Sequence, residues 1–398
     1  MNFKEFGLSQ ELLTEIEKLG FKEPTQIQEL TIPHILDWKD VIGESATGSG
    51  KTLAFGSGIV EHLLHGGGLQ ALVLTPTREL AEQVKNSLRQ FSYKKGLKIT
   101  SVYGGVSISR QISEIKKADV VVATPGRLLD HIRRKTIDLS NIQILVLDEA
   151  DRMLDMGFID DVEKIIRRCP NDRQTLFFSA TISEEIKELA NRYMTQPITV
   201  SAKKQVDPSK LKQVAYDVKK NMKLSLLVHL LKNETSKQAM VFCNTRRTTD
   251  FVAKTLKANG VNSIAIHGGL SQDKRTKTIK KFNNLPKGAL VCTDVASRGL
   301  HIEGVSHVYN YELPNDSKDY VHRIGRTARA GEEGKVINLL SKEEKNIFGE
   351  ILWKYPSFNV KKLKKPYVEK NLKIESNFRK RQSGKKHFPR AHKRGKTI

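Results

Sequence analysis

The stretch SATGSGKT, Ser45 to Thr52, is the part of the sequence that decides the fold. It matches the phosphate-binding pattern GxxxxGK[ST], except that Ser45 stands where the pattern has glycine. The short apolar run DVIG precedes it, and the segment TLAFGSGIVEHLL that follows has the apolar spacing of a helix. A strand, a glycine-rich loop and a helix in this order predict a nucleotide-binding loop at the end of a buried strand.

Short apolar runs alternate with longer segments of helical periodicity along the rest of the chain. The runs include ALVLT from Ala71, DVVVAT from Asp119 and ILVLD from Ile144. Because they are apolar without alternation, they suit strands that are buried on both faces of a parallel sheet. The sequence therefore predicts an α/β fold.

The second half of the chain repeats the plan of the first half. VLTPTREL, VYGG and VVATPGR have the counterparts VFCNTRRT, AIHGG and LVCTDVASRG. This repetition predicts two similar α/β units, in residues 1–203 and 213–352. The polar, basic residues 204–212 are predicted to form a linker, and residues 353–398 a disordered basic tail.

The charge of the chain is strongly positive. Its 398 residues include 68 Lys and Arg against 44 Asp and Glu, which gives a formal net charge of +24. Residues 361–398 hold 15 of the basic residues against Glu369 and Glu375, so they carry +13 and leave +11 for the rest of the chain. Such a field favours a nucleic acid or an anionic membrane as the partner.

Cysteine usage and hydropathy narrow the choice of compartment. The three cysteines, Cys169, Cys243 and Cys292, form no CxxC pair, which argues against a zinc site or a disulfide framework. The N-terminus has no apolar core of a signal peptide, and no run of about 18 apolar residues occurs. We therefore expect a reduced, cytoplasmic protein that spans no membrane.

A second motif, ILVLDEAD, places Asp148 and Glu149 at the carboxyl end of a predicted buried strand. Phosphoryl transfer from a nucleotide needs a carboxylate that holds the metal and a base that orients the attacking water. Asp148 suits the first role and Glu149 the second. Acidic residues after a strand can also simply cap a helix, but the presence of Lys51 favours the catalytic interpretation.

Several blocks in order carry a family resemblance. DEAD at Asp148–Asp151, SAT at Ser179–Thr181 and HRIGRTAR at His322–Arg329 resemble the signature blocks of DEAD-box RNA helicases, above all of the bacterial members. The resemblance runs from about Phe3 to about Leu340. It implies two tandem RecA-like domains, ATP with Mg²⁺ as the cofactors and RNA as the partner. That family also tolerates a small residue other than glycine at the position of Ser45.

The resemblance implies a catalytic set drawn from both units. Arg326 and Arg329 correspond to arginine fingers, which reach the γ-phosphate only when the units close. His322 and Arg323 would bridge toward the acidic motif and SAT. The implied catalytic residues are Lys51, Asp148, Glu149, Ser179, Thr181, His322, Arg326 and Arg329.

The block GFKEPTQIQ, Gly20 to Gln28, resembles the adenine-reading block of the family. Gln28 would select adenine by pairing with its N6 and N7, while Phe21 stacks on the ring. Thr52 and Asp148 would hold Mg²⁺ together with ATP. The residues implied in nucleotide binding are Phe3, Phe21, Gln28, Ala46, Thr47, Gly48, Ser49, Gly50, Lys51, Thr52, Asp151, Gly299, His301 and Arg323.

Loops in both units resemble the RNA-contacting loops of the family. Their glycines let backbone N–H groups approach phosphates, and Arg78 and Arg127 add positive charge. Such contacts read the sugar-phosphate strand, so we expect little sequence preference. The implied RNA-binding residues are Pro76, Thr77, Arg78, Gly104, Gly105, Thr124, Pro125, Gly126, Arg127, Thr245, Arg246, Gly268, Gly269, Gln272, Arg275, Thr293 and Asp294.

Two residues depart from the family pattern. Ala328 stands where glycine is usual, a change of one methyl group that we expect to matter little. His301 stands where most members have an aspartate that contacts the ribose of ATP. Since imidazole can still bond a sugar hydroxyl, we expect modestly weaker ATP binding.

Three functions are compatible with the sequence. The leading hypothesis is a monomeric ATP-dependent RNA helicase, and the alternatives are an RNA clamp that hardly hydrolyses ATP and a DNA translocase. The basic tail is expected to tether structured RNA, although it could instead serve as a solubilising segment or a nuclear address. Ribosome assembly or RNA turnover, with ribosomal particles or RNA-degradation proteins as partners, would suit a bacterial member.

Overall fold

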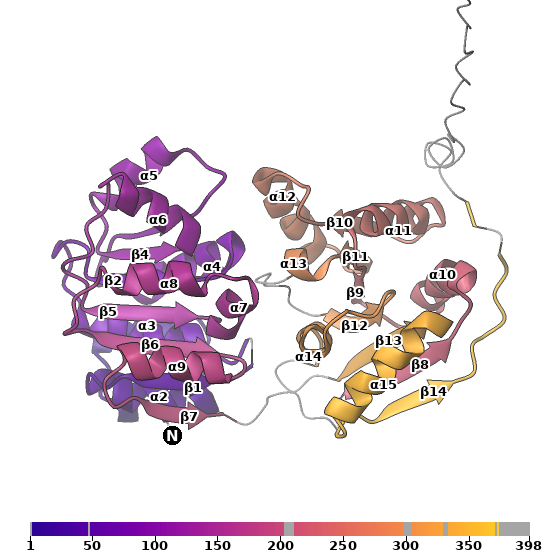
Figure 1. The fold of residues 1–398 in the computed structure, drawn as a ribbon, viewed down its shortest axis with the longest axis horizontal. Coiled ribbons are helices and arrows are strands. Elements are labelled where there is room, and N and C mark those ends of the chain that lie inside the picture. Colours follow the sequence, from indigo (N-terminus) through magenta and orange to yellow (C-terminus); the bar gives the residue numbers. More distant parts are fainter. Residues whose placement is uncertain are drawn as a thin grey trace, which may run out of the picture. The chain divides into compact units, whose positions relative to one another are not determined.

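The computed structural model describes residues 2–46, 48–202, 211–297, 302, 305–328, 333–370 and 372–373. The chain forms two compact units, which consist mainly of the residues up to Leu211 and of those from Lys212 onward. Each unit contains a seven-stranded sheet with helices around it (Figure 1). The predicted α/β fold with two similar units is confirmed. The unit boundary falls inside the predicted linker, most of which lies outside the described residues.

The first sheet is parallel throughout and has the spatial order β3-β4-β2-β5-β6-β1-β7. Its strands are β1 (Val41–Glu44), β2 (Ala71–Leu74), β3 (Ile99–Val102), β4 (Val120–Ala123), β5 (Ile144–Asp148), β6 (Gln174–Ser179) and β7 (Ile198–Ser201). The helices of the unit are η1 (Phe3–Phe6), α1 (Gln10–Lys18), α2 (Gln26–Leu36), α3 (Lys51–His62), α4 (Arg78–Phe91), α5 (Ile108–Ile115), α6 (Pro125–Arg133), α7 (Ala150–Asp155), α8 (Ile159–Ile166) and α9 (Glu184–Tyr193).

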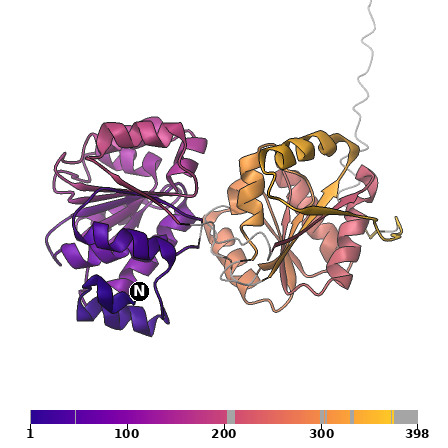
Figure 2. The ribbon, with the colours of Figure 1, turned by 90° about the horizontal axis from the view of Figure 1, so that it is seen from below.

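Two hydrophobic cores lie on the two faces of this sheet. Val73 of β2 belongs to the core that is covered by α1 to α4, whereas its neighbours Leu72 and Leu74 belong to the core under α6 to α9. Figure 2 shows the indigo and magenta helices on opposite sides of the sheet. Burial on both faces explains why the strands are apolar without alternation.

The second sheet has the spatial order β10-β11-β9-β12-β13-β8-β14. Its strands are β8 (Leu211–Asp217), β9 (Gln238–Phe242), β10 (Ser263–Ile266), β11 (Gly288–Cys292), β12 (Val305–Asn310), β13 (Gly334–Leu340) and β14 (Val360–Leu363). Its helices are η2 (Lys220–Met222), α10 (Lys223–Asn233), α11 (Arg246–Ala258), α12 (Gln272–Asn283), α13 (Asp294–Ser297), α14 (Ser317–Ile324), η3 (Lys342–Glu344) and α15 (Lys345–Lys354). Adding seven to each strand number of the first sheet gives this order, so the two units share one topology.

The second unit extends beyond its predicted end at residue 352. The last helix, α15, continues to Lys354, and β14 pairs in parallel with β8, with Val360 opposite Gln213. In the repeated topology β14 corresponds to β7 of the first unit. The predicted disordered tail therefore begins too early, because residues 360–363 form the edge strand of the sheet. Residues 374–398, which contain most of that predicted tail, lie outside the described residues.

Candidate active site

The phosphate-loop sequence lies between β1 and α3, as predicted. Gly48 and Gly50 have φ angles of 85° and 93°, which side chains other than glycine rarely adopt. Ser45 is not among the described residues with positive φ, and its hydroxyl lies 2.7 Å from that of Ser49. A serine therefore fits this position without backbone strain. Thr47 lies outside the described residues.

Lys51 is the first residue of α3 and is largely buried. Its Nζ donates a hydrogen bond to the Ser45 carbonyl oxygen at 2.9 Å, across the loop. A lysine held in this way points its charge into the loop, where phosphate oxygens would lie. Ala46, Gly48 and Ser49 complete the described part of the loop, and Thr52 follows in the first turn of α3.

Gln28 holds the adenine-reading block against the phosphate loop. Its Oε1 accepts a hydrogen bond from the Thr25 backbone N–H at 2.9 Å, and its Nε2 donates to the Gly50 carbonyl oxygen at 3.0 Å. A Cβ atom on Gly50 would come within 2.4 Å of this Nε2, which is a second reason for glycine there. Sequence reasoning assigned Gln28 to the adenine and missed this contact.

The two aromatic residues implied in nucleotide binding have different surroundings. Phe21 is 41% exposed and meets Phe91 edge-on, with ring centroids 6.4 Å apart, so it presents an accessible ring face. Phe3 is only 3% exposed and meets Phe6 edge-on inside the first core. This ring therefore packs in the first core, and its contact with a nucleotide stays a prediction.

The acidic motif lies at the carboxyl end of β5, next to β6 in the sheet. Burial raises the pKa of Asp148 to about 7, with the charge of Lys51 acting against the rise and that of Glu149 adding to it. Glu149 follows with a φ of 54°, an uncommon conformation for a residue with a side chain and one that is often found at functional sites. The turn brings both carboxyl groups to the start of α7.

Glu149 forms a buried ion pair that the sequence did not indicate. Its Oε2 lies 2.6 Å from Nη1 of Arg152, one turn along α7, and both side chains are less than one-tenth exposed. The guanidinium compensates the buried carboxylate and fixes its direction. Arg152 therefore belongs to the environment of the residue that we expect to orient water.

Asp151 connects the acidic motif with SAT. Its Oδ2 accepts hydrogen bonds from the backbone N–H and the hydroxyl of Thr181 at 3.0 and 3.1 Å. The Ser179 hydroxyl accepts from the Asp151 backbone N–H at 3.1 Å and donates to the Thr181 carbonyl oxygen at 2.8 Å. The structure thus brings these three predicted residues together within the first unit.

The expected Mg²⁺ ligands suit such an ion chemically. Mg²⁺ at nucleotide sites typically takes one or two protein ligands and completes its shell with phosphate oxygens and water. Asp148 supplies a buried carboxylate whose raised pKa shows that its charge lacks full compensation, so a cation would stabilise its ionised form. Thr52 supplies a hydroxyl beside Lys51 on α3.

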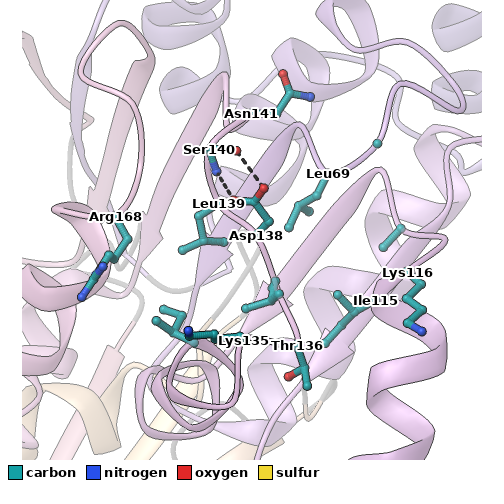
Figure 3. A pocket seen from close by; sticks show the side chains of 14 residues that line it. Leu69, Ile115, Lys116, Lys135, Thr136, Asp138, Leu139, Ser140, Asn141 and Arg168 are labelled. Carbon is teal, nitrogen blue, oxygen red and sulfur yellow. Dashed lines mark hydrogen bonds between the residues drawn. The ribbon is translucent and has the colours of Figure 1, made fainter.

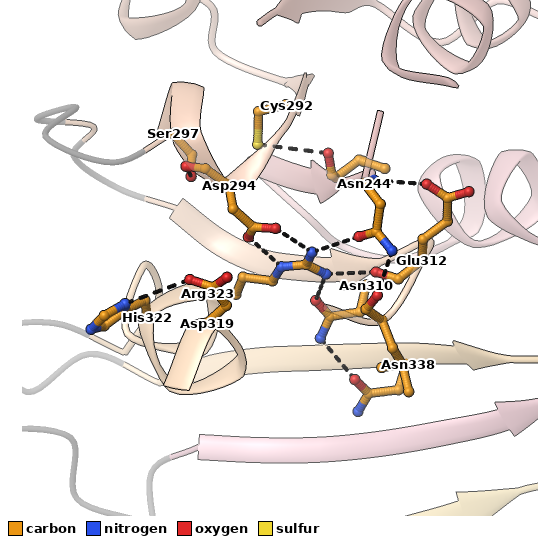
Figure 4. Close-up of polar contacts among 12 residues, drawn as sticks. Asn244, Cys292, Asp294, Ser297, Asn310, Glu312, Asp319, His322, Arg323 and Asn338 are labelled. Atoms are coloured by element: carbon orange, nitrogen blue, oxygen red, sulfur yellow. Dashed lines mark hydrogen bonds and ion pairs between the residues drawn. The ribbon is translucent and has the colours of Figure 1, made fainter. Parts of the chain in front are cut away.

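Arg323 is the centre of a hydrogen-bond network inside the second unit (Figure 4). Its Nε and Nη2 each lie 2.6 Å from the Asp294 carboxylate, and further donors reach the side-chain oxygens of Asn244 and Asn310 at 3.0 and 3.1 Å. The Glu312 carbonyl oxygen accepts another hydrogen bond from Nη1. The network joins the chain that follows β9, β11 and β12.

This network changes the interpretation of two predicted residues. Arg323 is 1% exposed, and its guanidinium also lies over the Phe242 ring, 5.0 Å from the centroid. Its placement gives it a structural role in the second unit, and the implied contacts with nucleotide and with SAT stay predictions. Asp294, which was implied in RNA binding, is committed to this ion pair.

The remaining residues of the HRIGRTAR block lie on and just after α14. His322 is partly exposed, and its Nδ1 lies 4.0 Å from the Asp319 carboxylate. Arg326 follows the helix end at Gly325 and is largely buried. Ala328 has a φ of 55°, which is the left-handed region that favours glycine. Arg329, Gly299 and His301 lie outside the described residues.

Three loops of the first unit meet at the carboxyl ends of β2, β3 and β4. Thr77 caps α4, and Gly105, with a φ of 82°, lies so near Arg78 that a Cβ there would be 2.0 Å from Nη1. A Cβ on Gly104 would be 3.3 Å from Arg78 and 3.9 Å from Arg127. The two predicted arginines thus converge on the Gly-Gly turn, with Pro76, Thr124, Pro125 and Gly126 in the same loops.

A buried network that the sequence did not reveal holds Arg127. Nη1 of Arg127 donates to Oε1 of Gln111 at 3.0 Å, and the same oxygen lies 3.1 Å from Nε2 of His131. Nε2 of Gln111 donates to the Tyr103 carbonyl oxygen, next to the Gly-Gly turn. Burial lowers the pKa of His131, so its ring is neutral and donates from Nε2. A single buried glutamine carries no periodic signal in a sequence.

The second unit repeats this arrangement at the carboxyl ends of β9, β10 and β11. Thr245 caps α11, and a Cβ on Gly268 would lie 3.4 Å from Nη2 of Arg246. Gly269 donates from its backbone N–H to Nδ1 of His267 at 3.1 Å. The remaining implied RNA-binding residues of this unit are Arg275, which donates to the Ala296 carbonyl oxygen, Thr293 at the end of β11, and Gln272, whose side chain is not described.

Comparisons with known proteins agree with the site. Residues 25–189 match the DEAD/DEAH box helicase family, and residues 222–331 match the helicase conserved C-terminal domain. The chain is 44% identical over 376 residues to ATP-dependent RNA helicase CshA of Limosilactobacillus reuteri, which covers 94% of this chain and 76% of that protein. Against DEAD-box ATP-dependent RNA helicase CshA of Bacillus subtilis, identity is 45% over 354 residues, or 88% of this chain and 72% of the relative.

Solved structures give the same result. The fold is similar to S. cerevisiae Dbp5 bound to RNA and ADP BeF3, with a TM-score of 0.83 at 32% identity over 91% of this chain and 95% of the other. It is also similar to Mss116p bound to single-stranded RNA and AMP-PNP, with a TM-score of 0.81 at 28% identity over 92% and 79% of the two chains. In the part of the chain that the structure describes, no helix combines the length and the apolar character needed to cross a bilayer. The chain belongs to the DEAD-box family of ATP-dependent RNA helicases.

Proposed function

We propose that the protein binds ATP and an RNA strand along one edge of each unit and uses ATP to separate short RNA duplexes locally. The observation that carries this proposal is the order of the first sheet. The nucleotide motifs follow β1, β5 and β6, whereas the RNA loops follow β2, β3 and β4, and the order β3-β4-β2-β5-β6-β1 keeps each set contiguous. Ligands of open α/β sheets bind at this carboxyl edge.

At the nucleotide half of this edge, Lys51 and the loop N–H groups bind the phosphates, and Gln28 and Phe21 bind the adenine. Asp148 and Thr52 hold Mg²⁺, which when bound offsets negative charge on the phosphate oxygens. Glu149 accepts a proton from the attacking water, and its ion pair with Arg152 keeps the carboxylate in place. Gln28 also links adenine binding to the loop, since it bonds the Gly50 carbonyl oxygen.

At the RNA half, Arg78 and Arg127 bind phosphates beside the Gly-Gly turn, and Arg246 does the same in the second unit. These contacts involve the sugar-phosphate strand, so sequence preference is weak. ATP and RNA together close the two units, which brings Arg326 and Arg329 to the γ-phosphate and bends the bound strand. Hydrolysis then reopens the units and releases the RNA.

We infer a role in ribosome assembly or RNA turnover, as a cytoplasmic monomer that meets ribosomal particles or RNA-degradation proteins. Residues 374–398 carry a net positive charge and tether structured RNA. Deleting them should weaken RNA binding and flatten its salt dependence, while ATP turnover at saturating RNA is kept. An unchanged salt slope would refute the tether.

The experiment that tests the function measures phosphate release and duplex separation by the full chain. RNA should stimulate phosphate release, and DNA of the same sequence should not. Glu149→Gln should retain ATP and RNA binding but lose turnover, whereas Arg127→Ala should raise the RNA concentration needed for half-maximal rate. Lys187→Ala, which removes an exposed lysine on α9 that pairs with Glu184, is the matched control and should leave both properties unchanged.

The outcomes separate the competing functions. Phosphate release that RNA does not stimulate would indicate an RNA clamp, because binding would then be uncoupled from hydrolysis. Equal stimulation by DNA would indicate a DNA translocase. Either result would contradict the proposed helicase function.

A further inference from the structure

A groove of about 760 Å³ lies at the edge of the first sheet that neither ATP nor RNA is expected to use. It is formed by the connections that lead into β2, β4, β5 and β6, which places it at the amino ends of these strands. All of the proposed nucleotide and RNA loops lie at the carboxyl ends. No function proposed above involves this groove.

The floor of the groove is aliphatic and its rim is basic. Leu69, Ile115 and Leu139 line it together with Ile132 and Ile137 (Figure 3). Lys116, Lys135 and Arg168 stand around it, and Figure 3 shows Lys116 and Arg168 on opposite sides with Leu69 and Leu139 between them. The three cations are exposed, and none of them forms an ion pair with another residue in the described ranges.

The single acidic residue of the lining already accepts hydrogen bonds within its own loop. Asp138 accepts hydrogen bonds from the backbone N–H and the hydroxyl of Ser140 at 3.0 and 2.9 Å, and these bonds lower its pKa. Its carboxylate is therefore turned into its own loop. The groove is left with a surplus of positive charge around an apolar surface.

The loop that forms one wall is held in place by buried polar side chains. Oδ1 of Asp119 accepts from the Gly66 N–H at 2.9 Å, and its Oδ2 accepts from the Lys98 N–H at 2.8 Å. Gln70 bonds both the N–H and the carbonyl oxygen of Leu64, at 3.1 and 2.7 Å. A groove with walls fixed in this way is formed before any partner binds, which lowers the entropic cost of binding.

The dimensions of the groove suit an extended peptide. It crosses the ends of four neighbouring strands, β4, β2, β5 and β6, which at about 4.8 Å between strands spans roughly 14 Å. An extended chain covers that distance with about four residues. A short segment with aliphatic side chains for the floor and carboxylates at each end for Lys116 and Arg168 would match the groove in shape and charge.

Other occupants fit less well. The basic residues 374–398 of this chain, and the basic surface of a second copy, would meet like charge at the rim. RNA would find phosphate-binding cations but no aromatic side chain in the lining on which a base could stack. We propose that this groove is a docking site for an acidic peptide segment with aliphatic side chains, supplied by a partner protein.

Binding of a labelled peptide to the full chain tests the proposal. The probe is a fluorescein-labelled octapeptide, Gly-Asp-Glu-Leu-Val-Leu-Glu-Asp, and its affinity is measured by fluorescence anisotropy. Lys116→Glu with Arg168→Glu should weaken binding at least about tenfold, because two attractive contacts become repulsive. RNA-stimulated ATP turnover of this variant should stay unchanged, since the groove lies away from the active site.

The matched control applies the same charge change elsewhere. Lys237 and Lys287 are exposed at the amino ends of β9 and β11 in the second sheet, so Lys237→Glu with Lys287→Glu alters the net charge equally. This control should bind the peptide with unchanged affinity. A second peptide, with serine in place of leucine and valine, should bind at least about tenfold more weakly to the unmodified protein, because the floor is aliphatic.

Three results would overturn the proposal. One is the absence of saturable peptide binding, and another is an equal loss of affinity in the groove variant and the control, which would indicate non-specific attraction. The third is weaker binding of a single-stranded oligouridylate by the groove variant but not by the control, without any peptide binding. That result would assign the groove to RNA.

Discussion

Oε1 of Gln111 accepts a hydrogen bond from Nη1 of Arg127 at 3.0 Å and lies 3.1 Å from Nε2 of His131. Both Gln111 and His131 are buried, whereas Arg127 belongs to a loop proposed to bind RNA. The glutamine, together with the Val106 carbonyl oxygen that accepts from the same Nη1 at 3.1 Å, therefore restricts the direction of the Arg127 side chain. It is a positioning residue, because it acts on RNA through Arg127.

Replacing Gln111 by methionine tests this role. Gln111→Met keeps the side-chain length but removes one of the two hydrogen-bond acceptors of the Arg127 Nη1 group, so the RNA concentration for half-maximal ATP turnover should rise about tenfold. The maximal rate at saturating RNA should stay unchanged. Gln90→Met, on the exposed side of α4, is the control and should alter neither value. A lower maximal rate with unchanged RNA dependence would contradict the positioning role.

The raised pKa of Asp148 makes the stability of the nucleotide-free protein depend on pH. Its folded-state pKa of about 7 lies above the ordinary value of 3.8, so the folded protein binds this proton more tightly than the unfolded chain. The contribution of Asp148 to stability is therefore present at low pH and is lost as pH rises from about 4 to about 7.

Thermal unfolding of Asp148→Asn in the presence of EDTA measures this effect. An amide is neutral at every pH, so the variant and the unmodified protein should unfold at similar temperatures near pH 4, where Asp148 is still protonated in the folded protein and is only partly ionised in the unfolded chain. At pH 8 the variant should unfold at a higher temperature, by about 2–4 °C for each kcal/mol relieved. A difference in unfolding temperature that does not grow with pH would contradict the assigned pKa.

Replacement of Arg326 should reduce ATP turnover, whereas replacement of Arg323 should reduce stability. Arg326→Ala should reduce ATP turnover by about three orders of magnitude while ATP and RNA still bind, because an arginine finger stabilises charge in the transition state. Arg323→Ala should instead destabilise the second unit by about 3–5 kcal/mol, because Asp294 loses its ion-pair partner.

Turnover assays and denaturant unfolding distinguish the two effects. Full ATP turnover in Arg326→Ala would contradict the proposal that residues of both units take part in ATP hydrolysis. A normal unfolding transition in Arg323→Ala would show that its hydrogen-bond network contributes little to the fold.

Ala328 has a φ of 55°, and glycine is expected to fit this backbone better. The left-handed conformation costs a residue with a Cβ about 1–2 kcal/mol, and glycine would remove this strain. The greater conformational freedom of glycine in the unfolded chain offsets part of the stability gained. Ala328→Gly should therefore stabilise the protein by roughly 1 kcal/mol in denaturant unfolding. Ala258→Gly at the end of α11 is the control and should destabilise it. Equal destabilisation by both would argue against strain at Ala328.

His301 stands where most family members have aspartate, and its replacement gives a prediction from the sequence alone. A carboxylate accepts hydrogen bonds from ribose hydroxyls more strongly than an imidazole does. His301→Asp should therefore lower the ATP concentration for half-maximal turnover by a few-fold. An unchanged or higher value would contradict this account of the departure.

The sequence predicted the fold class well because the signals are local. Each buried strand is an apolar run and each motif follows such a run, so the order of residues alone places Lys51, Asp148 and Arg78 at the carboxyl edge. The repeated motifs likewise indicated the repeated order of strands. The strand β14 was missed because the sequence NVKKLKK carries the charge pattern of a tail, and only pairing with β8 makes it a strand.

Contacts between distant residues could not be read from the sequence. The pairing of Gln28 with Gly50, of Arg152 with Glu149 and of Arg323 with Asp294 depends on how the strands are ordered in space. A polar residue has the same appearance in a sequence whether it faces a ligand or a buried partner. For this reason the burial of Phe3 and the hydrogen-bond network of Arg323 are visible only in the structure.

The strand β14 also determines where the chain can be shortened. Truncation at residue 352 would remove it and leave the backbone groups along one side of β8 without their partners. Leu211, Val214, Ala215 and Tyr216 make β8 an apolar strand, and an open apolar edge is a template for aggregation. Truncation after Lys373 would keep the edge covered and remove only the basic segment beyond it.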